Sequence, residues 1–148
     1  MAWLRAVYFL DQSRGWVAGS NGTLLATTDG GATWKKLSPL TKDTFQDVYF
    51  ADDEVGWLVV TRDIFKLKSN EAASYLLKTE DGGTTWRQVL LSGEDPNARL
   101  VRLVFADAQH GWVFGESGIV FGTHDGGRSW SESRLPEGVR DVYAVACG

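Results

Sequence analysis

One eight-residue stretch occurs three times in this chain, at residues 27–34, 79–86 and 123–130. Each copy reads Thr-x-Asp-Gly-Gly-x-Thr/Ser-Trp. Three matches to so long a pattern indicate an internally repeated protein, so the repeat constrains the fold before any other feature.

The repeated unit extends upstream of this box. A Gly-Trp pair precedes each box, and before it lies an apolar run that ends on Asp, at residues 7–11, 48–52 and 103–107. The distance from the Gly of Gly-Trp to the box Asp is 14 residues in copies one and three (15 to 29 and 111 to 125). In copy two it is 25 residues (56 to 81), so copy two carries an insertion.

Each copy divides into four short runs rich in Val, Phe, Tyr, Trp and Thr, bounded by Gly, Asp, Asn and Ser, which predict strands. The predicted strands are roughly 4–10, 15–19, 23–28 and 33–37; 45–51, 56–61, 75–79 and 85–90; and 100–106, 111–115, 118–123 and 129–133. Asn21-Gly22 predicts a tight hairpin turn. The inserted run 64–68 alternates in polarity and is expected to extend strands two and three of its copy.

Antiparallel units of four strands that recur after 52 and then 44 residues (Asp29 to Asp81 to Asp125) are typical of β-propeller blades. We therefore predict an all-β chain in one partial propeller domain over 1–148, with blades at about 2–38, 44–90 and 99–134. Residues 139–146 repeat the start of the unit and predict the first strand of a fourth blade.

Composition narrows the possible functions. A net charge of −4 leaves no electrostatic footprint for nucleic acid or an anionic membrane. No apolar run approaches the roughly 18 residues of a membrane span, and the first residues lack the apolar core of a signal peptide. The single cysteine, Cys147, excludes an internal disulfide.

The box itself is expected to staple the turn between strands three and four. Its carboxylate can accept hydrogen bonds from its own turn, its glycines supply positive φ, and its Trp anchors the hairpin between blades. The residues are Thr27, Asp29, Gly31, Thr33 and Trp34; Thr79, Asp81, Gly83, Thr85 and Trp86; and Thr123, Asp125, Gly127, Ser129 and Trp130. No catalytic residue, metal ligand or cofactor is predicted, because equivalent positions in separate blades do not converge on one substrate, and His110, His124 and Cys147 do not form a zinc spacing.

A binding site is expected on the opposite face, where the loops between strands two and three lie beside the links between blades. These segments are longer and more variable than the box turns, and function tends to lie on such loops. The candidate binding face comprises Arg62, Asp63, Phe65, Lys66, Lys68, Lys42 and Glu94. The strands expected to face the ring axis carry Arg5 and Arg140 at matching positions, which could line a channel, but Gln46 and Val101 hold these positions in the other copies.

The box resembles the Asp-box, or BNR, repeat. With the Val-Tyr-Phe-x-Asp run and the Gly-Trp pair, the whole unit resembles the photosystem II assembly and stability factor family (Ycf48/Hcf136-like). The resemblance implies a β-propeller of about seven blades that binds a protein partner without catalysing a reaction. It also implies an exported parent protein, in a periplasmic, lumenal or extracellular compartment.

Two questions stay open at this point. Three blades leave sheet faces bare, so the chain is either part of a longer propeller or a homo-oligomer, most simply a dimer that completes a ring. The alternative to a protein-binding scaffold is a glycoside hydrolase-related Asp-box propeller, sialidase-like or xyloglucanase-like, or an inactive fragment of one. Against it, the sequence lacks the Arg-Ile-Pro motif of sialidases and is too short for the two propellers of xyloglucanases.

Overall fold

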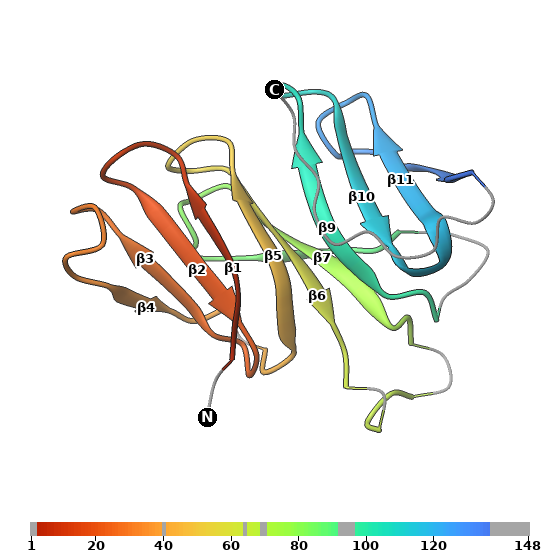
Figure 1. Cartoon of the computed structure of the whole chain (residues 1–148), viewed down its shortest axis with the longest axis horizontal. Helices are drawn as coiled ribbons and strands as arrows, with labels where there is room; N and C mark the ends of the chain where they lie inside the picture. Colours follow the sequence, from red (N-terminus) through yellow and green to blue (C-terminus); the bar gives the residue numbers. More distant parts are fainter. Residues whose placement is uncertain (1–2, 40, 64, 69–70, 92–96, 137–148) are drawn as a thin grey trace.

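A computed structural model describes residues 3–39, 41–63, 65–68, 71–91 and 97–136 of the chain. These residues form three four-stranded antiparallel sheets, one for each repeat copy, with the strands of each sheet in sequence order (Figure 1). The predicted all-β class and four-stranded propeller blades are confirmed. The proposed extra strand 139–146 lies outside the described residues.

We call the three sheets blades 1, 2 and 3. Blade 1 contains β1 (Leu4–Phe9), β2 (Gly15–Gly19), β3 (Leu24–Thr27) and β4 (Lys35–Leu37). Blade 2 contains β5 (Thr44–Phe50), β6 (Gly56–Thr61), β7 (Ser74–Thr79) and β8 (Arg87–Val89). Blade 3 contains β9 (Leu100–Phe105), β10 (Gly111–Gly115), a 3-10 turn (Glu116–Gly118), β11 (Ile119–Thr123) and β12 (Ser131–Arg134).

The fourth strand of each blade begins after the box Trp rather than at it, which corrects the predicted starts at 33, 85 and 129. The indole explains the difference in blades 2 and 3. The ring N–H of Trp86 donates to the carbonyl of Gly83 at 3.0 Å, and that of Trp130 donates to the carbonyl of Gly127 at 3.1 Å. The Trp therefore closes its own turn, and strand pairing starts beyond it.

The inserted run of copy two does not extend β6 and β7, so that expectation is wrong for the described part of it. Beyond the ends of these strands, the N–H of Arg62 still donates to the carbonyl of Ala73 at 2.8 Å. The chain then turns, because the carboxylate of Asp63 accepts from the N–H of Phe65 at 3.0 Å. A side chain that bonds its own backbone competes with strand pairing, and here it outweighs the alternating polarity.

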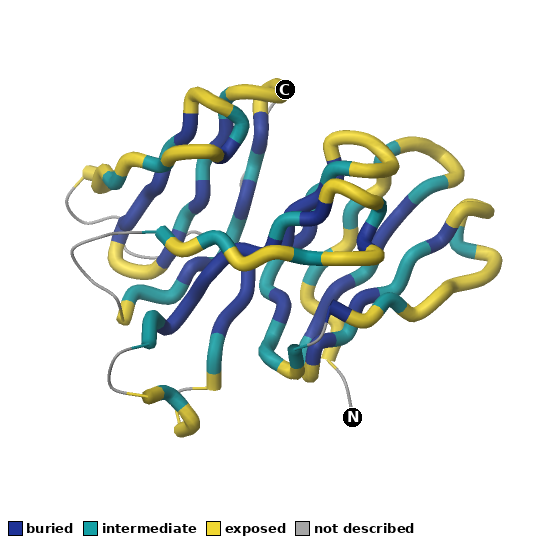
Figure 2. The backbone as a smooth tube through the Cα atoms, turned by 180° about the vertical axis from the view of Figure 1, so that it is seen from behind, coloured by how far each residue is buried: buried dark blue, intermediate teal, exposed yellow. Residues whose placement is uncertain are grey.

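The hydrophobic core lies between blades. One cluster joins blades 1 and 2 around Trp16 and Phe50, and a second joins blades 2 and 3 around Trp57 and Phe105. Blade 2 contributes to both, so all six residues of β6 are buried; Figure 2 shows the buried strands of blade 2 between the flanking blades. This layering is that of a stacked repeat, in which each unit buries its faces on its neighbours.

Packing explains why the first residue of each Gly-Trp pair is glycine. A Cβ on Gly56 would lie 2.4 Å from the ring of Phe50, and one on Gly15 or Gly111 would lie 2.6 Å from Phe9 or Phe105. The Phe that ends strand one lies across this glycine, so a larger residue would displace the ring.

Candidate functional site

The Asp boxes form the same hydrogen-bond network in all three blades. The Asp29 carboxylate accepts from the Thr27 hydroxyl at 2.8 Å, the Thr33 N–H at 2.9 Å and the Thr33 hydroxyl at 2.6 Å. Asp81 accepts the matching bonds from Thr79 and Thr85, and Asp125 those from Thr123 and Ser129. The second glycine of each box, Gly31, Gly83 or Gly127, has φ between +87° and +95°, a backbone region that favours glycine.

These bonds hold the box carboxylates ionised. The Thr33 hydroxyl, followed by the Thr33 N–H, lowers the pKa of Asp29 to about 2, and Thr85 does the same for Asp81. The pKa of Asp125 is lowered likewise, first by the Ser129 hydroxyl. Each carboxylate therefore serves its own turn and is unsuited to proton transfer near neutral pH.

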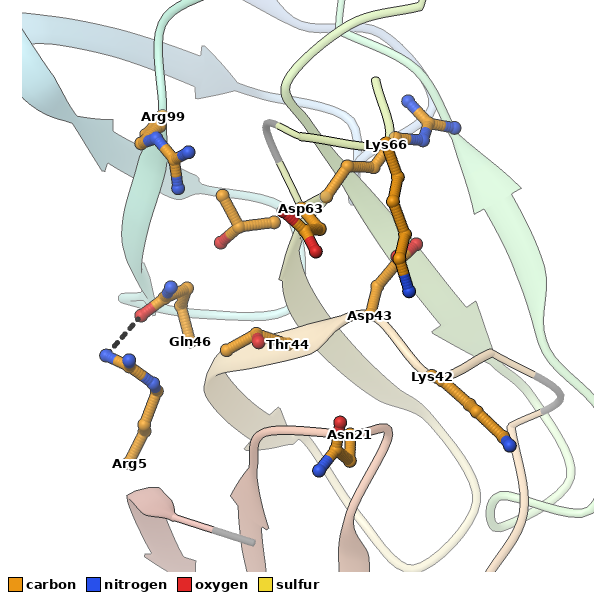
Figure 3. A pocket seen from close by; sticks show the side chains of 11 residues that line it. Arg5, Asn21, Lys42, Asp43, Thr44, Gln46, Asp63, Lys66 and Arg99 are labelled. Atoms are coloured by element: carbon orange, nitrogen blue, oxygen red, sulfur yellow. Dashed lines mark hydrogen bonds between the residues drawn. The ribbon is translucent and has the colours of Figure 1, made fainter. Parts of the chain in front are cut away.

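A cavity of about 510 Å³ lies at the end of the blades opposite the Asp boxes (Figure 3). There the loops between strands two and three meet the link from blade 1 to blade 2. Four residues of the predicted binding face line it: Lys42, Arg62, Asp63 and Lys66. The other lining residues are Arg5, Asn21, Asp43, Thr44, Gln46, Thr61 and Arg99.

The remaining predicted residues lie elsewhere. Phe65 is 91% exposed and does not line the cavity, although its neighbour Lys66 does. Lys68 is also exposed and outside the lining, and its N–H donates to the Glu71 carboxylate at 3.1 Å. Glu94 falls outside the described residues.

A β-bulge in each first strand shapes this end of the blades. Pairing shifts by one residue between Leu4 and Ala6 in β1 and between Phe45 and Asp47 in β5, which leaves Arg5 and Gln46 as the extra residues. Bulges re-aim side chains and are frequent next to binding sites. Both side chains line the cavity, and the Arg5 guanidinium donates to the Gln46 amide oxygen at 3.4 Å (Figure 3).

Arg62 is held in place by the structure around it. Its guanidinium donates to the carbonyl of Ala72 at 2.7 Å and lies 4.4 Å from the centre of the Tyr75 ring. The Tyr75 hydroxyl donates to Asp43 at 2.6 Å, and burial, followed by this bond, raises the pKa of Tyr75 to about 12. Tyr75 thus stays protonated, holds Asp43 by a hydrogen bond and provides the ring against which the Arg62 guanidinium lies.

The lining is cationic. Five basic side chains, Arg5, Lys42, Arg62, Lys66 and Arg99, stand against two carboxylates, Asp43 and Asp63. Arg62 is also paired with Glu71 at 3.7 Å and Arg99 with Glu116 at 3.9 Å, both outside the lining. The Thr61 hydroxyl has no hydrogen-bond partner among the described residues, but its oxygen is enclosed by protein atoms and is not available to a ligand. The surplus of cations favours an anionic ligand with hydrogen-bonding oxygens.

The sequence interpretation missed Arg99, Thr61, Asn21, Asp43 and Thr44 as site residues. Arg99 directly precedes β9 and Asp43 directly precedes β5, so an alignment of the repeat copies places both at the same end of their blades. That alignment was the available signal for Arg99 and Asp43. Thr61 had none, because its burial depends on how blade 2 packs.

Two other features lie outside the cavity. The rings of His110 and His124 are 5.4 Å apart, and His110 contacts Asp107 at 3.0 Å. In the described part of the chain, no group of three His, Cys, Asp or Glu residues is placed to hold a metal ion. Among the same residues, no helix is long and apolar enough to cross a membrane.

Comparison with known proteins identifies the family. Residues 2–65 and 36–142 match the model of a family described as photosynthesis system II assembly factor YCF48. The chain belongs to this family. The resemblance read from the Asp boxes and the Gly-Trp pairs is thereby confirmed.

Curated relatives support the same family. The chain is 28% identical over 131 residues to the photosystem II assembly lipoprotein Ycf48 of Synechococcus sp. (strain CC9902), which covers 86% of the chain and 35% of that protein. It is 28% identical over 126 residues to the photosystem II stability/assembly factor HCF136 of Arabidopsis thaliana, covering 81% of the chain and 28% of the relative. The chain thus spans about a third of the length of these curated relatives.

Solved structures show the same fold. YCF48 from Cyanidioschyzon merolae superposes with a TM-score of 0.67 at 25% identity, over 88% of this chain and 37% of that one. A structure of YCF48 bound to D1 peptide gives 0.70 at 26% identity, over 88% and 40%. A glycoside hydrolase, the GH74 enzyme of Niastella koreensis, gives 0.60 at 16% identity over 85% and 22%, a likeness in fold alone.

Proposed function

We propose that this chain is a non-enzymatic protein-binding scaffold of the assembly-factor kind, and that its cationic cavity receives an acidic segment of a partner protein. The cavity carries the proposal, since its basic side chains outnumber its carboxylates and suit carboxylate oxygens. A solved structure is described as YCF48 bound to D1 peptide, and this supports a peptide as the class of ligand.

The glycoside hydrolase alternative fits the residues less well. Such enzymes need a pair of carboxyl groups, one on each side of the bond that is cut. Of the two carboxylates in the cavity, Asp43 is already bonded to the Tyr75 hydroxyl, and the Asp-box carboxylates are committed to their own turns. The likeness to the GH74 enzyme extends to the fold and no further.

Peptide binding by charge-reversal variants tests the proposal. The probe is a fluorescein-labelled acidic peptide with a free carboxyl terminus, and a lysine-rich peptide of the same length serves as the charge control. Lys42→Glu with Lys66→Glu places two carboxylates in the cavity and is expected to weaken binding of the acidic probe by about tenfold or more, measured by fluorescence anisotropy.

Lys68→Glu is the matched control for Lys66→Glu alone, because both replace one exposed lysine by glutamate and Lys68 does not line the cavity. It should leave affinity within about twofold of the unmodified chain. If the double variant binds the acidic peptide as well as the unmodified chain does, or if both probes bind equally, the cavity is not the peptide site.

A further inference from the structure

Both histidines of this chain, His110 and His124, lie together at the Asp-box end of blade 3. Their ring centroids are 5.4 Å apart, although 14 residues separate them along the chain (110 to 124). The hairpin of β10 and β11 brings them together, because Gly111 pairs with Thr123 and the two histidines are the next residue on either side (Figure 1). Spacing along the chain does not reveal a shared site here, since the two positions meet only when the hairpin forms.

The backbone at both positions is held in place. The N–H of His110 donates to the Asp107 carboxylate at 2.8 Å. His124 lies between Thr123 and Asp125, whose side chains are bonded to each other in the Asp box at 2.8 Å. Two side chains on fixed backbone bind a ligand between them at a lower entropy cost than two on mobile loops.

The Asp107 carboxylate also orients the His110 ring. Nδ1 of His110 lies 3.0 and 3.1 Å from the two oxygens of this carboxylate. Because a carboxylate only accepts hydrogen bonds, this contact places the proton of the neutral ring on Nδ1 and leaves the lone pair of Nε2 available. Histidines that bind metal ions usually have this arrangement, in which a carboxylate holds the nitrogen that does not bind the metal.

We propose that His110 and His124 together bind one divalent transition metal ion of the Zn²⁺ class, through one ring nitrogen each. Imidazole suits zinc, copper and nickel. Two imidazoles on one tetrahedral zinc ion have their ring centres about 5 Å apart, given a Zn–N distance of about 2 Å, and the observed separation of 5.4 Å fits this.

Water completes the coordination of this ion. The described residues provide no third histidine, cysteine or carboxylate ligand, so the site keeps open positions and holds the ion exchangeably. His110 is partly buried and His124 is exposed, so an ion reaches the pair from solvent.

The histidine pair is a property of blade 3 and not of the repeat. The matching positions hold Arg14 and Thr28 in blade 1, and Val55 and Glu80 in blade 2. The three blades share the same hairpin and the same box network, so the fold does not require histidine at these positions. The pair lies at the opposite end of the blades from the peptide cavity, and metal binding and peptide binding therefore succeed or fail independently.

Calorimetric titration of the whole chain with zinc chloride tests the proposal. Every protein carries Cys147→Ser, so that the single thiol does not bind the metal. We expect one zinc ion per chain, and His124→Gln should weaken binding by about tenfold or more, since loss of even a supporting partner costs that much. Long-range ¹H–¹⁵N spectra contain only these two imidazoles, and one equivalent of zinc should shift a ring nitrogen in both.

His124→Gln combined with Thr28→His is the matched control. It keeps two histidines in the chain but places them in different blades, and Thr28 is exposed as His124 is. It should bind zinc as weakly as His124→Gln alone. The proposal is overturned if this control binds zinc as tightly as the chain with both native histidines, if only one ring responds to zinc, or if one ion is bound for every two chains.

Discussion

At the scale of single residues, the box carboxylates connect hydrogen bonding to the pH dependence of stability. Thr33 and Thr85 hold the pKa values of Asp29 and Asp81 at about 2, against an ordinary 3.8. In the unfolded chain these carboxyls take up protons at a higher pH than in the folded one. Between pH 3.8 and 2 the unfolded state therefore binds more protons, and stability falls as pH falls.

We predict that Asp81→Asn flattens this dependence. The amide stays neutral at every pH, so the variant loses the contribution of one box above pH 4 and shows a shallower decline between pH 4 and 2 than the unmodified chain. The measurement is the urea midpoint from pH 6 to 2. Burial raises the pKa of Asp47 and gives a slope of opposite sign, but both proteins share it.

Thr84→Ala is the control, because Thr84 is an exposed, variable position of the same box. It should reproduce the slope of the unmodified chain. Parallel pH curves for Asp81→Asn and the unmodified chain would show that the box carboxylate does not couple to folding.

Position along the chain predicts some of the residues that line the cavity and misses others. Lys42, Arg62, Asp63 and Lys66 are predictable because they lie on variable loops at the end of the blades that has the cavity. Phe65, on the same loop as Lys66, is 91% exposed and does not line the cavity, because loop membership does not fix side-chain direction. The unpartnered hydroxyl of Thr61 follows from packing, which spacing along the chain does not encode.

At the scale of strands, Asp47 links blade 2 to blade 3. It follows the bulge in β5, and its carboxylate accepts from the N–H of Val48 and from the N–H of Leu103 in β9, both at 2.9 Å. The repeat pattern predicted the strands because polarity, turn residues and Gly-Trp pairs agree in all three copies. It did not predict this bond, since Ala6 and Arg102 hold the matching positions after the bulges of blades 1 and 3.

We predict that Asp47→Ala weakens the contact between blades 2 and 3. It leaves two backbone N–H groups without their acceptor, at a cost of roughly 1–3 kcal/mol for each one that stays buried. Urea unfolding of Asp47→Ala should show a lower midpoint than the unmodified chain. Asp47→Asn keeps one accepting oxygen, so its midpoint should lie between those of Asp47→Ala and the unmodified chain. Asp53→Ala, at an exposed aspartate, controls for loss of a carboxylate; equal midpoints for Asp47→Ala and Asp53→Ala would contradict the prediction.

At the scale of the whole molecule, the middle blade takes part in both parts of the described core. Blade 2 contributes to both core clusters, whereas blades 1 and 3 each contribute to one. The fourth strands β4, β8 and β12 contain mostly exposed residues. In stacked repeats the free energy of local opening follows the number of covered faces, so the blades should open at different free energies.

Amide hydrogen exchange measures this order directly. We predict the slowest exchange in β6 and β7, faster exchange in β2 and β10, and the fastest in β4, β8 and β12. Trp57→Ala, which removes a side chain 2% exposed in the core between blades 2 and 3, should speed exchange in β9 and β10 more than in β2. Uniform acceleration in all three blades would instead mean that the described sheets unfold as one cooperative unit.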